Sequence, residues 1–475
     1  MPLNIRKMWL DTIKKYYLNP TAPGSDKYWS PGLDTASRAR ILEIQSEKLE
    51  VSVRFLYELS PFWKKKFDDH KLRPSDVKSV EDLHKIPITT PKDISEDMAV
   101  HPPWGTCTTI TDRVLKERGS FVYTSTGTTG RPKVFRFPRL DRDIQAWADA
   151  RAAYAMGIRG GDSALICFGF GPHGFMWGLT FCFSNLMGVT VIPGGGMDGK
   201  MRGTYVDMLK PTILAATPSY LLYLGEHMKN EVGIDPAKSS VKFLIAGGEP
   251  GASIPATKKR IEELWNAELH EYIGFTEGAT HAGGYSCQVE GKKEAMSPHL
   301  MDDLQIFEVV DPQTFEPLPE GERGVVVCTN LCSEMMPTPR FLVGDFTTIT
   351  TEPCACGRTH QRAIGGFRGR IDDMLLIRGI NVFPTTIEQV VRDFKELGDE
   401  YAIVVDDVKG YADITVQVEP MPEIPKSQHE ELHNRLVLKL RSQIEVRPTV
   451  ELKPHGTLPR TEFKAKRIKD LRKHQ

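Results

Sequence analysis

The sequence has no excess of either charge sign. Its 475 residues carry 61 Lys and Arg against 62 Asp and Glu, a formal net charge of −1. Proteins that bind nucleic acid mainly by electrostatic attraction have a clear basic excess. The balance therefore argues against a nucleic-acid-binding protein. With 40% hydrophobic and 26% charged residues, the composition is typical of a soluble globular chain.

The sequence also lacks a long uninterrupted apolar run. The stretch 175–192 is broken by Gly, Ser, Asn and Thr, and the first 17 residues are punctuated by charges, so neither a membrane span nor a secretory signal is predicted. Cysteine is scarce, with eight residues in the chain, which is too few for a disulfide framework. We therefore expect a cytoplasmic protein without membrane contact.

From about residue 120, short apolar runs alternate with amphipathic segments. This alternation predicts an α/β fold with mostly parallel, helix-covered sheets. A smaller β section is expected over 324–350, and a compact α+β module over roughly the last 100 residues. The predicted strands of the main section are Ala164–Phe168, Val189–Ile192, Thr212–Ala216 and Val241–Ala246.

A loop of small residues lies between Tyr123 and Lys133 and is the sharpest local signal. Glycines without a Cβ let backbone N–H groups approach phosphate oxygens, and Lys133 adds a positive charge. The spacing is not that of a Walker loop. By residue type alone, a flexible surface loop is the alternative. The predicted phosphate-binding residues are Thr124, Ser125, Thr126, Gly127, Thr128, Thr129 and Gly130.

Further motifs follow in a fixed order along the chain. They are Gly247–Pro250, Gly274–Glu277, Gly344–Asp345, Gly369–Asp373, Ile377–Pro384 and Leu458–Lys464. Together with the loop, this series resembles the adenylate-forming superfamily of acyl-CoA synthetases, luciferases and peptide-synthetase adenylation domains. Within this superfamily, the amino-acid sequences of segments 372–384, 456–465 and 352–360 are most similar to the phenylacetate–CoA ligase branch.

The resemblance implies a two-step ligase reaction. A carboxylate and ATP would give acyl-AMP and pyrophosphate, and the thiol of coenzyme A would then take the acyl group. It also implies two domains: residues 1–371 with the ATP and acyl sites, and residues 372–475 as a mobile lid that rotates about the hinge residue Asp372. Gly379 would then line the path of pantetheine.

The resemblance also assigns roles to polar residues. Glu277 matches the Mg²⁺ ligand, and Thr276 would bond the α-phosphate. Asp345 matches the acid that accepts the ribose hydroxyls, Arg370 a second ribose or phosphate contact, and Lys464 the lysine that bridges carboxylate and α-phosphate. Outside the motif series, such residues would be read as a helix cap and surface charges. The expected adenine-side residues are Gly248, Glu249, Pro250, Tyr272, Ile273 and Gly274.

Two positions depart from the family pattern. Ile273 replaces the aromatic residue that lies on the adenine, with Tyr272 one place earlier as a possible substitute. Phe463 replaces the glycine before the catalytic lysine. Neither change removes a charged catalytic group, so we interpret the chain as an enzyme. The alternative that these two changes suggest is a non-catalytic protein that binds an acyl-adenylate.

A metal site is also implied by the resemblance. Cys287, His299, Cys354 and Cys356 match a site in part of this ligase branch, and three thiolates with one imidazole suit tetrahedral, structural Zn²⁺. The spacing alone leaves other ligands open, namely Cys328, Cys332, His281 and His360, and it also leaves open cysteines that bind no metal.

The acyl substrate is predicted from aromatic residues in the region where the branch builds its pocket. They favour an aryl or arylacetic acid over a long fatty acid, although an aromatic cluster can also be plain core. The expected pocket residues are Phe137, Trp147, Phe170, His173 and Phe175. An enzyme that loads a carrier-protein thiol or an amine is the rival interpretation, and a homodimer is expected from the branch.

Overall fold

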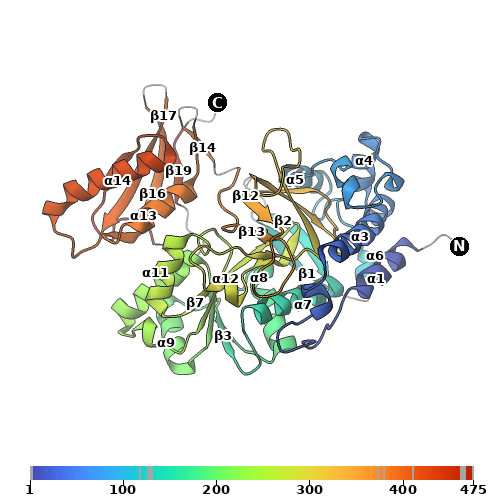
Figure 1. Cartoon of the computed structure of the whole chain (residues 1–475), viewed down its shortest axis with the longest axis horizontal. Helices are drawn as coiled ribbons and strands as arrows, with labels where there is room; N and C mark the ends of the chain where they lie inside the picture. Colours follow the sequence, from blue (N-terminus) through green and yellow to red (C-terminus); the bar gives the residue numbers. More distant parts are fainter. Residues whose placement is uncertain are drawn as a thin grey trace. The chain divides into compact units, whose positions relative to one another are not determined.

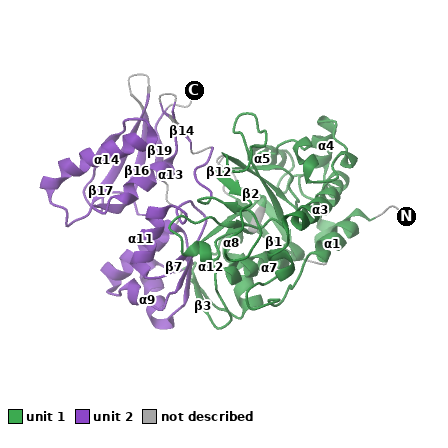
Figure 2. Cartoon of the chain, in the orientation of Figure 1, with its two compact units in different colours: residues 1–196, 270–366 green, residues 197–269, 367–475 purple. Residues whose placement is uncertain are grey.

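The chain passes twice through each of two structural units. The computed structural model describes residues 4–116, 119–125, 132–371, 374–377, 380–408, 411–460 and 467–472. Unit 1 comprises residues 1–196 and 270–366, and unit 2 comprises residues 197–269 and 367–475 (Figure 2). The α/β class predicted from the sequence is confirmed (Figure 1).

Unit 1 begins with helices. Residues 38–69 form two helices, α3 (Arg38–Leu59) and α4 (Pro61–Asp69). The break falls at Ser60, whose side chain accepts the Trp63 N–H as the N-cap of α4, with Pro61 at the first helical position. The other helices here are α1 (Ile5–Lys15), α2 (Pro31–Asp34), α5 (Pro91–Val100) and α6 (Asp112–Leu115).

A hairpin and a parallel strand pair follow. Strands β1 (Ser120–Ser125) and β2 (Lys133–Pro138) are antiparallel and flank the predicted phosphate loop. Helix α7 (Arg139–Ala155) leads to β3 (Ser163–Ile166), and α8 (Gly174–Phe181) precedes β4 (Thr190–Pro193). Strands β3 and β4 are parallel, as the alternation of strands and helices predicted.

The rest of unit 1 is antiparallel. Its strands lie in the order β10-β11-β12-β13-β9-β8-β7, and each neighbouring pair is antiparallel. The predicted β section at 324–350 corresponds to β11 and β12. The bounds are β7 (Glu268–Phe275), β8 (Ala279–Tyr285), α12 (Gln288–Gly291), β9 (His299–Leu300), β10 (Gln305–Val310), β11 (Arg323–Asn330), β12 (Phe341–Thr350) and β13 (Arg362–Ala363).

Unit 2 contains a parallel pair and the C-terminal module. Strands β5 (Ile213–Ala216) and β6 (Phe243–Ala246) are parallel and fully apolar. The accompanying helices are α9 (Gly199–Leu209), α10 (Pro218–His227) and α11 (Pro255–Trp265).

The predicted α+β tail is confirmed. A sheet in the order β18-β17-β16-β19 packs with α13 and α14 around a buried apolar core that includes Val391, Ile403 and Leu436. The bounds are β14 (Leu375–Ile377), β15 (Ile380–Val382), α13 (Pro384–Asp393), β16 (Leu397–Val408), β17 (Tyr411–Pro420), α14 (His429–Ile444), β18 (Thr449–Leu452) and β19 (Ile468–Asp470). The division between residues 371 and 372 stays a prediction, because Asp372 lies outside the described residues.

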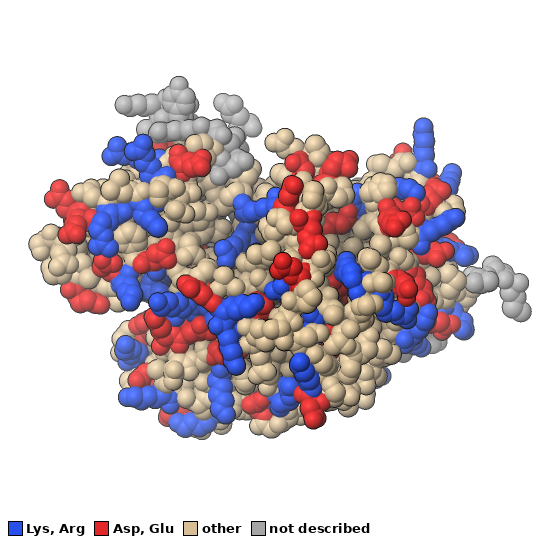
Figure 3. Space-filling view, in the orientation of Figure 1, with Lys and Arg blue, Asp and Glu red and all other residues tan. Residues whose placement is uncertain are grey.

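Charges are mixed on the molecular surface. On the face shown in Figure 3, basic and acidic side chains lie next to each other, in keeping with the net charge of −1. Among the described helices, none is both long enough and apolar enough to cross a membrane.

Candidate functional site

The two ends of the predicted phosphate loop are held side by side. Strand β1 ends at Ser125, β2 begins at Lys133, and these two residues are partners in the hairpin register. Just before the loop, the N–H of Thr124 donates to the Pro172 carbonyl at 2.6 Å. The predicted phosphate contacts of the loop itself stay predictions, since its residues lie outside the described part of the chain: Thr126, Gly127, Thr128, Thr129 and Gly130.

Glu277 joins these two loop ends. Its Oε1 accepts a hydrogen bond from Ser125 Oγ at 2.7 Å and lies 3.0 Å from Lys133 Nζ. The Lys133 and Glu277 side chains are 8% and 9% exposed, so the ion pair is largely shielded from water. The structure therefore brings Glu277 together with Ser125 and Lys133, which are distant from it in sequence, and all three were predicted for the nucleotide site. A carboxylate oxygen is also a ligand that Mg²⁺ prefers.

The other unit 1 residues predicted for the nucleotide are partly exposed. Thr276 lies in the turn between β7 and β8, next to Glu277, and Gly274 is exposed at the end of β7. Asp345 is half-buried in β12, directly after Gly344. Gly274 and Thr276 are thus accessible at the end of β7 and in the turn after it, and Asp345 is partly accessible in the middle of β12.

The remaining predicted nucleotide residues belong to unit 2. Glu249 is engaged in a cap, because its Oε1 accepts the N–H of Ser219 at 2.8 Å in the first turn of α10. Burial raises its pKa above the usual range. Gly248 is exposed, whereas Pro250 and Arg370 are half-buried. Asp372, Gly379 and Lys464 lie outside the described residues, so their roles stay predictions.

Tyr272 cannot replace an aromatic side chain at position 273. Successive side chains of a strand point to opposite faces, so Tyr272 and Ile273 face opposite sides of β7. The Tyr272 hydroxyl donates to Asp149 Oδ1 at 2.6 Å, and its ring centroid lies 4.2 Å from that of Phe175. Tyr272 is thus buried beside the aromatic residues predicted for the acyl pocket, and the half-buried Ile273 occupies the other face.

Two aromatic residues of the predicted acyl pocket lie against tyrosines. Phe175, near the start of α8, packs on Tyr272, and Phe137 of β2 packs on Tyr123 with ring centroids 4.8 Å apart. His173 is exposed at the N-cap of α8. Phe170 is 45% exposed and packs on Trp177.

Trp147 lies elsewhere. In α7, Gln145 and Asp149 are one turn apart and face Tyr123 and Tyr272, through hydrogen bonds of 3.2 and 2.6 Å. Trp147 is two positions from each, so it projects from the opposite face of the helix. Its indole N–H donates to the Leu18 carbonyl at 2.8 Å, and its ring meets Tyr17 edge-on. The structure thus places Trp147 in the packing of α7 on the N-terminal segment, not with Phe137 and Phe175.

The four predicted metal ligands converge. The ligand atoms of Cys287, His299, Cys354 and Cys356 all lie within 4.8 Å of one another, and all four residues are buried. The Sγ atoms of Cys287 and Cys354 are 3.8 Å apart, and Cys356 Sγ lies 3.4 Å from His299 Nε2. Hydrogen bonds from Cys287 and Cys354 hold the pKa of Cys356 well below that of an ordinary thiol.

These separations fit a tetrahedral ion. Zinc–sulfur bonds of about 2.3 Å place two sulfurs at the corners of a tetrahedron about 3.8 Å apart. Among the described residues, no other group of at least three His, Cys, Asp or Glu has this geometry. The competing candidate His360 is engaged otherwise, because its Nδ1 and Nε2 each lie 3.0 Å from a carbonyl, of Leu300 and Leu33.

Asp149 was missed by the sequence analysis. It is fully buried, and its Oδ1 accepts both the Tyr272 hydroxyl and the Ala282 N–H, whereas its Oδ2 has no hydrogen-bond partner. Burial raises its pKa to about 7. The only signal in the sequence is an acidic residue between alanines in an otherwise apolar helical segment, 146–150.

Comparison with known proteins identifies the family. The model described as "AMP-binding enzyme" matches residues 33–333, and the model of the "AMP-binding enzyme C-terminal domain" matches residues 379–472. The chain belongs to the AMP-binding enzyme family, as its motif series indicated.

The similar proteins are CoA ligases. The phenylacetate-coenzyme A ligase of Thermus thermophilus is 33% identical over 462 residues, which covers 94% of this chain and 100% of the relative. That of Aromatoleum evansii is 33% identical over 453 residues, 93% of this chain and 98% of the relative.

Solved structures agree. The 2-hydroxyisobutyryl-CoA ligase in its postadenylation state with R3-HIB-AMP has a TM-score of 0.87 at 29% identity, covering 94% of this chain and 93% of that chain. The same ligase with 2-HIB-AMP and CoA has a TM-score of 0.70 at 30% identity, covering 95% and 94%. Together the comparisons place the chain among the AMP-forming acid–CoA ligases.

Proposed function

We propose that this ligase activates an aromatic or arylacetic acid with ATP, giving acyl-AMP and pyrophosphate, and transfers the acyl group to coenzyme A. The observation that carries the proposal is the contact of Glu277 with Ser125 and Lys133 at the ends of the phosphate loop. It joins a carboxylate, a hydroxyl and a cation where a triphosphate would bind. The names of the relatives, phenylacetate-coenzyme A ligases, support the acid class.

Each residue of this group has a distinct task. Lys133 offers a positive charge to phosphate oxygens, and Ser125 a hydroxyl that can donate to them. The carboxylate of Glu277 would hold Mg²⁺, which supplies charge neutralisation to the triphosphate. Thr276 would bond the α-phosphate, and Asp345 the ribose hydroxyls. Lys464 would bridge the carboxylate and the α-phosphate in the first step, so Lys464→Ala should abolish AMP formation.

The acyl group would lie beside Phe137 and Phe175. Flat aromatic side chains bind an aryl ring through offset or edge contacts and exclude water from it. Phe175 also contacts Tyr272, whose hydroxyl is fixed by Asp149, so this wall is rigid. The support is the aromatic character of this wall together with the names of the relatives.

Zn²⁺ would have a structural role. Three sulfurs and one imidazole nitrogen fill a tetrahedral shell and leave no position for a substrate. The ligands come from the segment before α12, from β9 and from the 354–356 loop, so the ion would tie together segments far apart in sequence. A homodimer and a cytoplasmic location stay predictions.

A screen of aromatic acids tests the proposed function. Purified protein with ATP and Mg²⁺ should catalyse ATP–pyrophosphate exchange with at least one aryl or arylacetic acid, and CoA should then yield the thioester. Exchange without thioester formation from free CoA would favour loading of a carrier-protein thiol or an amine. Acyl-adenylate binding without any exchange would favour a non-catalytic protein.

A further inference from the structure

The backbone of the turn that carries Glu277 is held from outside the nucleotide motifs. Thr338 Oγ1 lies 3.0 Å from the Glu277 carbonyl oxygen and 3.0 Å from that of Met336, so one hydroxyl proton serves two acceptors. Asn330 Nδ2 donates to the carbonyl of Gly278 at 2.7 Å. Both side chains are buried, so these carbonyls have protein donors in place of water.

Asn330 also shapes the segment that presents Thr338. Its Oδ1 accepts the N–H groups of Cys332 and Ser333 at 2.8 and 3.0 Å, and its own N–H donates to the Thr338 carbonyl at 3.0 Å. Residues 330–338, here called the clamp loop, are therefore closed on themselves by one asparagine. The same side chain that organises the loop reaches the turn of Glu277.

The middle of the clamp loop is fixed by Asp141, in the first turn of α7. Asp141 Oδ2 accepts the Ser333 hydroxyl at 2.8 Å and the Met335 N–H at 3.0 Å, and its Oδ1 accepts the Glu334 N–H at 2.6 Å. Three donors on one buried carboxylate leave the loop little freedom.

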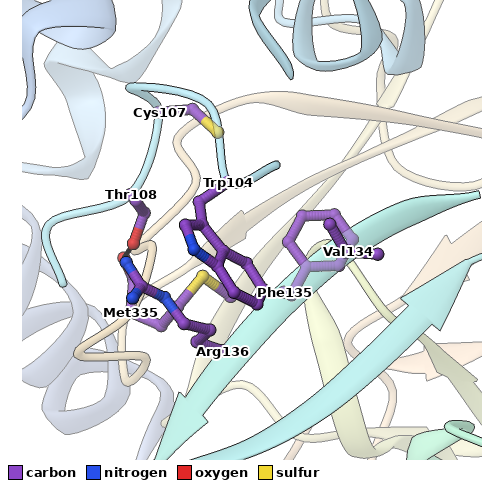
Figure 4. A pocket seen from close by; sticks show the side chains of 7 residues that line it. All are labelled: Trp104, Cys107, Thr108, Val134, Phe135, Arg136 and Met335. Carbon is purple, nitrogen blue, oxygen red and sulfur yellow. Dashed lines mark hydrogen bonds between the residues drawn. The ribbon is translucent and has the colours of Figure 1, made fainter. Parts of the chain in front are cut away.

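Met335, in the same loop, also packs against other segments of unit 1. Met335 lines a small pocket with Trp104, Cys107 and Arg136, whose guanidinium lies 4.4 Å from the Trp104 ring centroid (Figure 4). The Met335 carbonyl accepts a hydrogen bond from the Thr109 N–H at 2.9 Å. The loop is thus held both by Asp141 and by the packing of Met335, so its polar contacts to the turn at 277–278 come from a well-fixed segment.

We propose that Thr338 and Asn330 are positioning residues for the nucleotide site. By fixing the carbonyls of Glu277 and Gly278, they set where the Glu277 carboxylate lies relative to Ser125 and Lys133. A carboxylate displaced by a fraction of an ångström would coordinate a metal–nucleotide less well, because Mg²⁺ demands near-ideal geometry. This inference rests on the proposed function only in that Glu277 is the residue that meets the metal-bound nucleotide.

The test compares hydroxyl deletions in the full-length protein. Thr338→Val should weaken binding of Mn²⁺·ATP, followed by the electron paramagnetic resonance of free Mn²⁺, about fivefold to tenfold, since a buried carbonyl loses its donor. Thr338→Ser, which keeps the hydroxyl, should restore binding to within twofold. The matched control is Thr12→Val, because Thr12 likewise donates to a carbonyl at 3.0 Å, that of Met8 in α1, and it should leave binding unchanged.

A second variant guards against misfolding. Asn330→Asp keeps the oxygen that accepts from Cys332 and Ser333, but an ionised carboxylate cannot donate to Gly278, and the variant should weaken Mn²⁺·ATP binding as Thr338→Val does. In pyrophosphate exchange, the Mg²⁺ concentration for half-maximal rate should rise while KM for the acid stays within twofold. Unchanged Mn²⁺·ATP binding in both variants, or equal loss in Thr12→Val, overturns the proposal. Wild-type binding of Mn²⁺·ATP without exchange on any acid would instead count against the proposed function alone.

Discussion

Lys133 Nζ lies 3.0 Å from Glu277 Oε1, and this ion pair connects the phosphate-loop hairpin with the turn between β7 and β8. The two residues are 144 positions apart in the sequence. Both charges are largely withdrawn from water, so each depends on the other for compensation. The ion pair therefore links two segments of the fold and also places one positive and one negative side chain at the predicted nucleotide site.

Removal of one partner should cost more stability than removal of both. Lys133→Met leaves the Glu277 carboxylate uncompensated and should lower the free energy of unfolding by about 2–3 kcal/mol. The double variant Lys133→Met/Glu277→Gln should recover most of that loss, because no buried charge is left alone. Denaturant unfolding of the wild type, Lys133→Met, Glu277→Gln and the double variant measures the coupling energy between the two side chains. If the two single changes in the free energy of unfolding simply added up in the double variant, this expectation would be contradicted.

Neither single nor double variant should be active. Without the Lys133 cation, or without a carboxylate at position 277 to hold Mg²⁺, pyrophosphate exchange should fall about 100-fold or more. Recovery of stability in the double variant without recovery of exchange separates the structural from the catalytic contribution. Exchange close to that of the wild type in Glu277→Gln would remove this residue from the nucleotide site.

Asp149 should make stability depend on pH. Burial raises its folded-state pKa from 3.8 to about 7, so between these values the folded protein binds the proton and the unfolded chain does not. The contribution of Asp149 to the free energy of unfolding therefore falls as the pH rises from about 4 to 7, and it is constant above that range. Asn cannot ionise, so the stability of Asp149→Asn relative to the wild type should rise by about 2 kcal/mol from pH 5 to pH 7.

Unfolding at pH 5, 7 and 8 measures this difference. The Asn side chain keeps an oxygen for the Tyr272 hydroxyl and the Ala282 N–H, so those hydrogen bonds remain. A stability difference that does not change over this range would show that Asp149 is ionised throughout in the folded protein.

Metal removal should destabilise the fold. We expect about one zinc per chain by elemental analysis, and Cys354→Ser should lose it and lower Tm, because a structural ion contributes directly to folding. The matched control is Cys328→Ser, which changes a buried cysteine outside the cluster and should keep the metal. A wild-type protein purified without chelators and free of bound metal would refute the site.

Phe175 and Trp147 should behave differently when truncated. Phe175→Ala should raise KM for the aromatic acid about tenfold with KM for ATP unchanged, since the acid loses ring contacts worth about 1–1.5 kcal/mol. Trp147→Phe should lower stability through the lost hydrogen bond to Leu18 and leave KM for the acid unchanged. If Trp147→Phe raised KM for the acid as much as Phe175→Ala does, Trp147 would have to line the acyl pocket after all.

The sequence predicted the fold well where burial leaves a clear pattern. The strands β3 to β6 are short, apolar and bounded by helices, so continuous apolar runs identify them. The C-terminal module has alternating strands and amphipathic helices that can be read in the same way. The four residues proposed as metal ligands, three of the eight cysteines and His299, do meet in space, although only the family resemblance selected them, and their binding of a metal stays a prediction.

Side-chain direction and backbone contacts were not predictable. Trp147 and Phe175 are both aromatic residues near the site, and only the helical phase of α7 relative to its neighbours separates them. Thr338 and Asn330 act on carbonyl oxygens, and main-chain acceptors leave no mark in a sequence. Asp149 could be noticed as a charge in an apolar segment, but its partner Tyr272 is 123 positions away.

The most direct test of the central claim is the stoichiometry of products with phenylacetate, ATP, Mg²⁺ and CoA, followed by chromatography. We expect AMP, pyrophosphate and phenylacetyl-CoA in equal amounts, or, when a related aryl acid replaces phenylacetate, the thioester of that acid in the same ratio. Formation of ADP and phosphate, or release of AMP from every aryl and arylacetic acid tested without any CoA thioester, would contradict it.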